Sequence, residues 1–181
     1  GRLRVSSSRP WYTALRAASV GLVEGLTWHE IAAGLQRGGS QLRLIAVHTR
    51  NGALILDDTY NASPESVLAA LNLLSELDGR KVAVLGDMYE LGQYEKEGHE
   101  VVGRRAAAVC STLVAVGQLG KMIADAALSA GMPSWAITWL PGVFEAAKYL
   151  KENLRPGDVA LIKGSHGLRM ERIVAALEVV E

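Results

Sequence analysis

The chain has 181 residues, and its 19 Lys and Arg residues balance 19 Asp and Glu residues. This balance argues against nucleic acid or an anionic membrane surface as a partner, because both select basic proteins. Apolar residues make up 49% of the sequence, enough for a packed core, and no apolar run is long enough for membrane insertion. The single cysteine, Cys110, excludes an internal disulfide and fits a reducing compartment, so we expect a cytoplasmic protein.

Two helices are expected near the start of the chain. Small and apolar residues dominate residues 11–24, and Gly25 predicts the end of this helix. Thr27 and Glu30 have the spacing of a capping box, which predicts that a second helix begins there. The Gly-Gly-Ser sequence at residues 38–40 predicts a break after it.

A hairpin and then a regular strand–helix alternation follow. Residues 42–49 alternate as a strand, and Asn51-Gly52 predicts a tight turn into a strand at residues 53–56. Apolar runs of four or five residues then alternate with longer helical patterns, which predicts an α/β fold with an open, mostly parallel, Rossmann-like sheet and helices on both faces. The expected helices cover residues 64–77, 94–109, 120–130, 143–153 and 168–178, and the expected strands cover residues 81–86, 113–117, 136–140 and 158–162.

Three strand-to-helix junctions carry unusual polar or glycine-rich sequences. They are Asp57-Asp58-Thr59-Tyr60-Asn61, the segment Gly86–Gly92 and the segment Lys163–Arg169. Ligands of open α/β sheets bind at the carboxyl ends of the strands, so we expect these junctions to form the site. The basic third junction suits a phosphate or carboxylate, and the acidic first junction suits a cationic or metal-linked group.

Other interpretations of these residues stay open. Asp57-Asp58 could equally cap the turn that follows, and Gly86-Asp87 could be an ordinary exit from a strand. The segment Gly117–Met122 has the wrong spacing for a phosphate loop, and no His, Cys, Asp and Glu set has metal-ligand spacing. His29, His48 and His99 are isolated, so we expect surface or packing roles for them.

In order and spacing, these motifs resemble the C-terminal domain of the Mur ligases over residues 43–178. The segments that carry the resemblance are Asp57–Pro64, Leu85–Gly92, His99 with Val102-Gly103, and Lys163–Glu171. Within the family, they most resemble the branch that adds D-alanyl-D-alanine to UDP-N-acetylmuramoyl-tripeptide in peptidoglycan synthesis. The sequence departs from the pattern at Ser63, where Asn is usual, and at His166, where Arg is usual.

The resemblance implies roles for individual residues. Asp58 and Asn61 would lie near the ribose and base of a nucleotide. Asp87, Lys163, Ser165 and Arg169 would lie near the incoming dipeptide, whose carboxylate needs a cation.

The resemblance also implies a domain organisation. Residues 1–42 would be the helical remnant of a central ATPase domain, and residues 43–181 would be the C-terminal domain. ATP and magnesium would act in the full-length enzyme, whose central domain carries the phosphate loop and the metal ligands. We therefore expect this chain to hold no complete catalytic set, to bind neither cofactor tightly and to be inactive alone. A non-catalytic module for a nucleotide or small anion, and a related ligase such as MurE or folylpolyglutamate synthase, are the alternatives.

Overall fold

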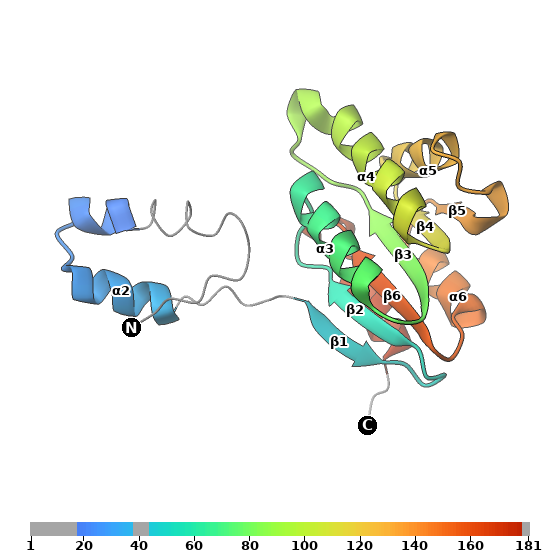
Figure 1. Cartoon of the computed structure of the whole chain (residues 1–181), viewed down its shortest axis with the longest axis horizontal. Helices are drawn as coiled ribbons and strands as arrows, with labels where there is room; N and C mark the ends of the chain where they lie inside the picture. Colours follow the sequence, from blue (N-terminus) through green and yellow to red (C-terminus); the bar gives the residue numbers. More distant parts are fainter. Residues whose placement is uncertain (1–17, 38–43, 179–181) are drawn as a thin grey trace. The chain divides into compact units, whose positions relative to one another are not determined.

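The computed structural model describes residues 18–37 and 44–178, and the chain divides into two compact units, residues 1–42 and 43–181 (Figure 1). In the first unit, a helical segment over residues 18–23 is followed by helix α2 (Trp28–Arg37). The predicted capping box is confirmed: the Thr27 backbone N–H donates to the Glu30 carboxylate at 2.8 Å, and the Glu30 N–H donates to the Thr27 hydroxyl at 3.3 Å. Gly25 follows the first helix with φ +81°, as a helix stop requires.

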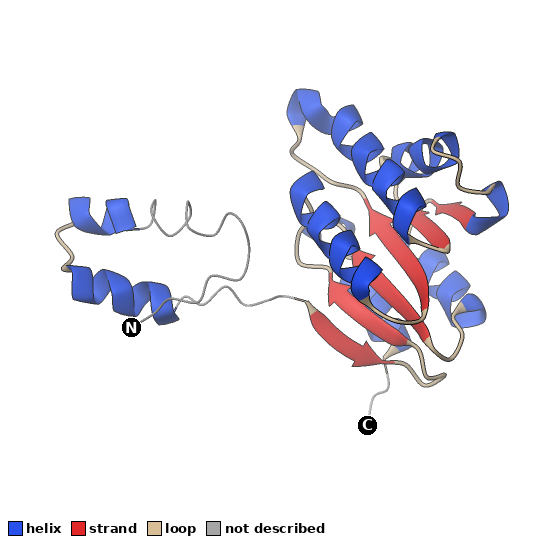
Figure 2. Ribbon diagram, viewed as in Figure 1, coloured by secondary structure: helices blue, strands red, loops and turns tan. Residues whose placement is uncertain are grey.

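The second unit is built around a six-stranded sheet, whose strands are red in Figure 2. The strand order is β1-β2-β6-β3-β4-β5, as the labels of Figure 1 show. The first two strands form the predicted antiparallel hairpin, with φ +83° at Gly52, and the other strand pairs are parallel. The strands are β1 (Ile45–His48), β2 (Leu54–Asp58), β3 (Arg80–Gly86), β4 (Thr112–Val116), β5 (Ile137–Leu140) and β6 (Asp158–Lys163).

Helices cover both faces of the sheet, as the alternation predicts. One apolar core lies between the sheet and helices α3 (Pro64–Glu76), α4 (Glu95–Val109) and α5 (Gly120–Ser129). The other lies under α6 (Val143–Asn153) and α7 (Glu171–Leu177). Strand β3 shows how the sequence builds two cores: Ala83 and Leu85 enter the first, while Val82 and Val84 enter the second.

Several predicted boundaries differ from the structure. Strands β2 and β6 each extend further than predicted, so that Asp58 and Lys163 are their last residues. The prediction that the closing helix begins at Leu168 is wrong: residues 166–168 form a 3-10 turn, Arg169 adopts φ +62°, and α7 begins at Glu171. Residues 11–17, 38–40 and 42–43, which belong to other predicted elements, lie outside the described residues.

Ser63, one of the departures from the family pattern, has a clear local role. Its hydroxyl accepts from the Ser66 N–H at 3.3 Å, and the Ser66 hydroxyl lies 3.0 Å from the Ser63 N–H. The two serines therefore cap α3 reciprocally, with Pro64 in the first turn. Within residues 18–37 and 44–178, every helix is too short or too polar to span a bilayer.

Candidate functional site

The strand order brings the three predicted junctions together at one edge of the sheet. Strand β6 lies between β2 and β3 and runs parallel to both. The carboxyl ends of these strands therefore lie side by side, and each leads into one of the polar junctions. This is the edge at which open α/β sheets bind ligands.

The buried Lys163 and the partly buried Asp58 form an ion pair across two of these strands. They are partners in the parallel register, and the Lys163 Nζ lies 2.6 Å from the Asp58 Oδ2. The same ammonium donates to the Asn61 carbonyl at 2.8 Å, so Lys163 also holds the turn after β2. The Lys163 side chain is 3% exposed and that of Asp58 is 20% exposed. The acidic junction after β2 and the basic junction after β6 are thus joined by an ion pair whose net charge is zero.

Asp57 and Asp58 have different roles. The Asp57 Oδ1 accepts from the Thr59 N–H at 3.0 Å and from the Thr59 hydroxyl at 2.8 Å. This is the turn-capping arrangement expected of an Asp at the start of a turn. The capping interpretation is therefore correct for Asp57, whereas Asp58 faces the neighbouring strand.

Asp87 is buried and caps the neighbouring helix. Its Oδ1 accepts from the Gly120 N–H at 2.7 Å, at the first residue of α5, where the positive end of the helix dipole favours a carboxylate. Its Oδ2 accepts from the Tyr89 hydroxyl at 3.2 Å. Burial, together with the negative charge of Asp87 and this hydrogen bond, raises the pKa of Tyr89. A protein carboxylate therefore occupies the start of α5, the one segment with a partial likeness to a phosphate loop.

Ser165 joins the junction after β6 to the junction after β3. Its N–H donates to the Asp87 carbonyl at 2.9 Å, and its hydroxyl accepts from the Tyr89 N–H at 2.9 Å. Ser165 is 4% exposed, which places it inside the loop network. Together with Lys163, it links the end of β6 to the loops on both sides.

His99 fixes the backbone of Met88, which lies between Asp87 and Tyr89. Its Nε2 accepts from the Met88 N–H at 3.0 Å, and its Nδ1 lies 2.6 Å from the Glu95 carbonyl. Because Nε2 accepts, Nδ1 carries the proton and donates. The predicted packing role is thus confirmed for His99, which is fully buried, while His29 and His48 are exposed. The hydrogen bonds of His99 depend on the tertiary fold and have no sequence signal of their own.

Exposed side chains lie beyond this buried network. The rings of Tyr60 and His166 have centroids 6.0 Å apart at an interplanar angle of 37°. Arg169, which the sequence predicts as a site residue, is exposed, and its Nε lies 2.5 Å from the Glu171 Oε1. Sequence reasoning missed Tyr60 and Glu171 as separate site candidates, although both lie inside the quoted motifs.

Among the residues that the structure describes, no group of three or more His, Cys, Asp or Glu side chains is placed to bind a metal ion. Two polar groups at the junction after β2 are available to a nucleotide. Asn61 is exposed, and the second oxygen of Asp58 has no hydrogen-bond partner within the described ranges. These groups can accept from hydroxyls or donate to a base, which suits the ribose and base of a nucleotide.

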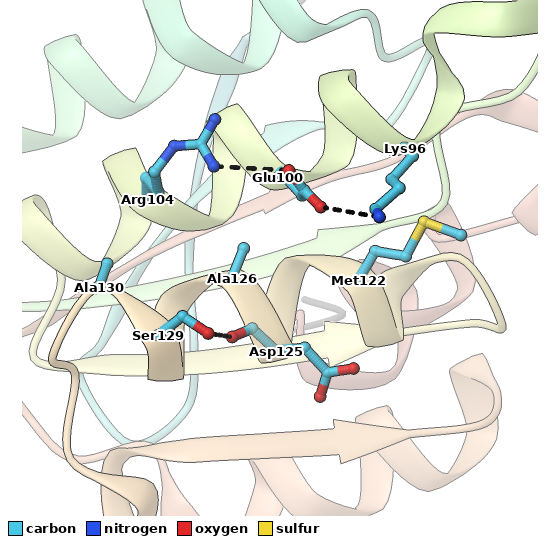
Figure 3. A pocket seen from close by; sticks show the side chains of 8 residues that line it. All are labelled: Lys96, Glu100, Arg104, Met122, Asp125, Ala126, Ser129 and Ala130. Carbon is cyan, nitrogen blue, oxygen red and sulfur yellow. Dashed lines mark hydrogen bonds and ion pairs between the residues drawn. The ribbon is translucent and has the colours of Figure 1, made fainter.

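A separate cavity of about 400 Å³ lies between α4 and α5 (Figure 3). Lys96, Glu100 and Arg104 line it on α4, where Glu100 pairs with both cations at 3.6–3.8 Å. The residues from α5 include Met122 and Asp125. None of the predicted site residues lines this cavity, and its α4 charges are satisfied by one another, so we assign it no role.

Comparison with known proteins identifies the family. Residues 42–166 match the family model described as Mur ligase, glutamate ligase domain. Over 172 residues the chain is 34% identical to the UDP-N-acetylmuramoyl-tripeptide–D-alanyl-D-alanine ligase of Bacillus subtilis, a match that covers 91% of this chain and 36% of the relative. The Escherichia coli ligase of the same name is 34% identical over 175 residues, with the same two coverages. The chain thus spans about a third of the length of these relatives.

Solved structures agree with the sequence comparison. A MurF structure from Acinetobacter baumannii matches 97% of this chain and 39% of its own, with a TM-score of 0.68 at 31% identity. The MurF ligase from Thermotoga maritima in complex with ADP matches 75% of this chain and 30% of its own, with a TM-score of 0.63 at 32% identity. A family match across more than half of the sequence, supported by these structures, shows that the chain belongs to the Mur ligase family.

Proposed function

We propose that residues 43–181 are the C-terminal domain of an ATP-dependent ligase that joins D-alanyl-D-alanine to UDP-N-acetylmuramoyl-tripeptide. Residues 1–42 would then belong to the central ATPase domain of the same enzyme, which acts in the cytoplasm in peptidoglycan synthesis. The observation that carries the proposal is the meeting of the Asp58, Asp87 and Lys163 junctions at one edge of the sheet. The names of the relatives supply the two substrates.

In this proposal, the site residues divide into those that contact ligands and those that position loops. Asp58 and Asn61 contact the nucleotide, because each keeps a polar group available beside the hairpin. Lys163, Ser165 and Asp87 are buried and hydrogen-bonded within the protein, so they support the dipeptide site by fixing its loops. A rigid supporting layer keeps an acceptor amine in line for attack, and orientation of this kind can contribute about 7–11 kcal/mol.

The chemistry requires a central domain as well. ATP supplies the phosphoryl group that converts the tripeptide carboxylate into an acyl phosphate, which the amine of the dipeptide then attacks. The 181 residues contain no G-x-x-x-x-G-K-[ST] sequence, so we assign the phosphates and magnesium to the central domain. The task of this chain is to orient the dipeptide and to exclude water, which would hydrolyse the acyl phosphate.

The test is a phosphate-release assay on two proteins. The 181-residue chain alone, given ATP, magnesium and both substrates, should release no phosphate. A chimera in which residues 43–181 replace the corresponding domain of the Bacillus subtilis ligase should release phosphate only when D-alanyl-D-alanine is present. Asp58→Ala should reduce the activity of the chimera, whereas Asp125→Asn, on the exposed surface of α5, should leave it unchanged.

Two results would contradict the proposal. Turnover by the isolated chain would show that the central domain is not required. A folded but inactive chimera, beside an active parent enzyme, would favour the alternative of a binding module without catalysis, above all if the chain still bound ADP.

A further inference from the structure

A cleft of about 600 Å³ is lined by three parts of the second unit: the turn between β1 and β2, the end of α6 and the end of α7. His48 pairs with Leu54 at the start of β2, which places this turn beside the amino ends of the parallel strands. Figure 1 shows the turn at the end of the sheet away from the arrowheads of β2 and β3. The cleft therefore lies at the opposite edge of the sheet from the three polar junctions.

Polar contacts hold the three walls of the cleft together. The Asn51 Nδ2 donates to the Leu154 carbonyl at 2.7 Å and so joins the turn to the end of α6. The Asn51 Oδ1 accepts from the Thr49 hydroxyl at 2.6 Å, which fixes the orientation of the amide. An isolated β-bridge pairs Thr49 with Glu178 and joins the turn to the end of α7. The cleft is thus formed before any ligand arrives, as small-molecule sites usually are.

The floor of the cleft is apolar. Leu154 and Leu177 line it, and both belong to the core under α6 and α7, with 7% and 8% of their surface exposed. Ala175 and Ala176 add two methyl groups. The volume of the cleft falls within the range of pockets that hold small ligands. The hydrophobic effect therefore favours an apolar group on this floor.

Two cations of the cleft are unpaired within the part of the chain that the structure describes. Arg50 on the turn and Lys151 on α6 are exposed, and neither makes a hydrogen bond or an ion pair there through its side chain. A guanidinium matches the geometry of a phosphate or carboxylate, and an ammonium adds a second positive charge. The whole chain has no net charge, so a general attraction for anions is not expected. The two cations beside an apolar floor therefore indicate an anionic ligand with an apolar part.

Lys151 is not needed as a hydrogen-bonding cap for α6. It lies in the last turn, where a cation suits the negative end of the helix dipole. The carbonyls at this end already have donors, because Asn153 accepts from the Arg80 Nη2 at 3.2 Å and Leu154 accepts from Asn51. The ammonium of Lys151 is therefore available to a ligand.

We propose that this cleft binds a small organic anion, in which a phosphate or carboxylate is joined to a short apolar group. The anionic group binds Arg50 and Lys151, and the apolar group packs on Leu154 and Leu177. Glu178 also lines the cleft, so two cations and one carboxylate leave one net positive charge for the ligand. The inference does not depend on the proposed ligase function, because the cleft contains none of the residues assigned to it.

The experiment is an NMR titration of the 181-residue chain. Hexyl phosphate and hexanoate carry both parts of the proposed ligand, whereas inorganic phosphate and 1-hexanol each carry one part. Arg50→Gln and Lys151→Gln each remove a cation, and Glu178→Gln removes the carboxylate. The control is Lys96→Gln, which removes one positive charge from an 80% exposed side chain on α4, a helix that covers the other face of the sheet. Thermal unfolding reports whether each variant is folded.

Hexyl phosphate, hexanoate or both should cause saturable shifts at residues 49–51, 151 and 175, and the tighter of the two identifies the anionic group. Inorganic phosphate and 1-hexanol should bind more weakly. Arg50→Gln and Lys151→Gln should each weaken binding by about twofold to fivefold, the effect of an exposed ion pair. Glu178→Gln should strengthen binding by a similar factor, because it removes a like charge, and Lys96→Gln should leave binding unchanged.

Three outcomes would overturn the inference. The first is the absence of saturable shifts at the cleft with both hexyl phosphate and hexanoate. The second is binding of 1-hexanol as tight as that of the two anions, which would leave the cations without a role. The third is an equal loss of binding in Lys96→Gln and in the two cleft variants, which would show a general charge effect. The phosphate-release assay on the chimera tests the proposed function separately.

Discussion

Replacing Asp58 by alanine should destabilise the domain more than replacing its partner Lys163 by methionine. The two side chains differ in exposure, 20% for Asp58 against 3% for Lys163. Without Asp58, the ammonium stays buried, and the Asn61 carbonyl is its remaining partner among the described residues. Without Lys163, solvent can hydrate the Asp58 carboxylate, and the methionine side chain fills most of the vacated volume.

The magnitudes follow from this asymmetry. Removing one member of a buried ion pair costs about 3–5 kcal/mol, since it leaves a buried charge uncompensated. We expect about 3 kcal/mol for Asp58→Ala, at the lower end because the Asn61 carbonyl remains. For Lys163→Met we expect about 1 kcal/mol, because the Asp58 carboxylate that remains is partly exposed and can be hydrated. The double variant Asp58→Asn, Lys163→Met buries no unpaired charge, so it should be more stable than Asp58→Ala.

Urea unfolding of the 181-residue chain, followed by far-ultraviolet circular dichroism, measures these differences. A loss of about 3 kcal/mol should also lower the thermal midpoint by roughly 10 °C in a domain of this size. The control is Asp125→Ala, since Asp125 and its partner Lys121 are both largely exposed, and it should cost about 0.5 kcal/mol or less. The reasoning fails if Lys163→Met proves the more destabilising substitution, or if Asp58→Ala unfolds like the wild type.

Three further predictions concern the rest of the domain. Gly103→Ala should destabilise it by about 2 kcal/mol despite the better helix propensity of alanine, because the new Cβ would strike a backbone carbonyl of α5. Gly98→Ala in the same helix meets side-chain atoms of Pro64 and Leu91 but no backbone, so it should cost less, and urea unfolding measures both. Burial raises the pKa of the Cys110 thiol to about 12, so Ellman's reagent at pH 8 should label it only after unfolding. Burial opposes ionisation of Asp158, but hydrogen bonds from Arg80 outweigh it and lower the pKa below 3.8. The stabilisation by this pair is therefore complete above pH 3.8 and is lost as the pH falls through the lowered pKa, so Asp158→Asn should flatten the acid dependence of the thermal midpoint.

The sheet could be predicted from the sequence because its strands have a simple local cause. Strand β4 is a run of apolar residues in which Leu113 faces one core and Val114 and Val116 face the other. Such a run fits a strand covered on both faces, whatever its neighbours are. Helix starts were predictable for a similar reason, since capping boxes such as that of Thr27 and Glu30 act over three residues.

The site was harder to predict, because its contacts depend on strand order. Asp58 and Lys163 are 105 residues apart, and they pair because β6 is inserted beside β2. Apolar periodicity does not encode that order. Lys163 follows an apolar run, so the sequence alone favours a cation directed at a ligand, whereas the structure makes it the last residue of the strand and buries it.

The position of a charged side chain relative to the end of its strand explains whether it pairs within the protein or stays exposed. Asp58 and Lys163 are the last residues of parallel strands, where the register places a side chain against its neighbour, and they neutralise each other. His166 and Arg169 come after the strand has ended, on a turn that leaves their side chains exposed. At the ends of β2 and β6, the charges inside the strands therefore hold the edge of the sheet together, and the charges beyond β6 remain exposed. Asp87, beyond the end of β3, is buried because it caps α5. The part of the predicted site that can still meet a ligand is the turn from His166 to Glu171, together with the exposed Asn61 and the unpaired oxygen of Asp58 at the junction after β2.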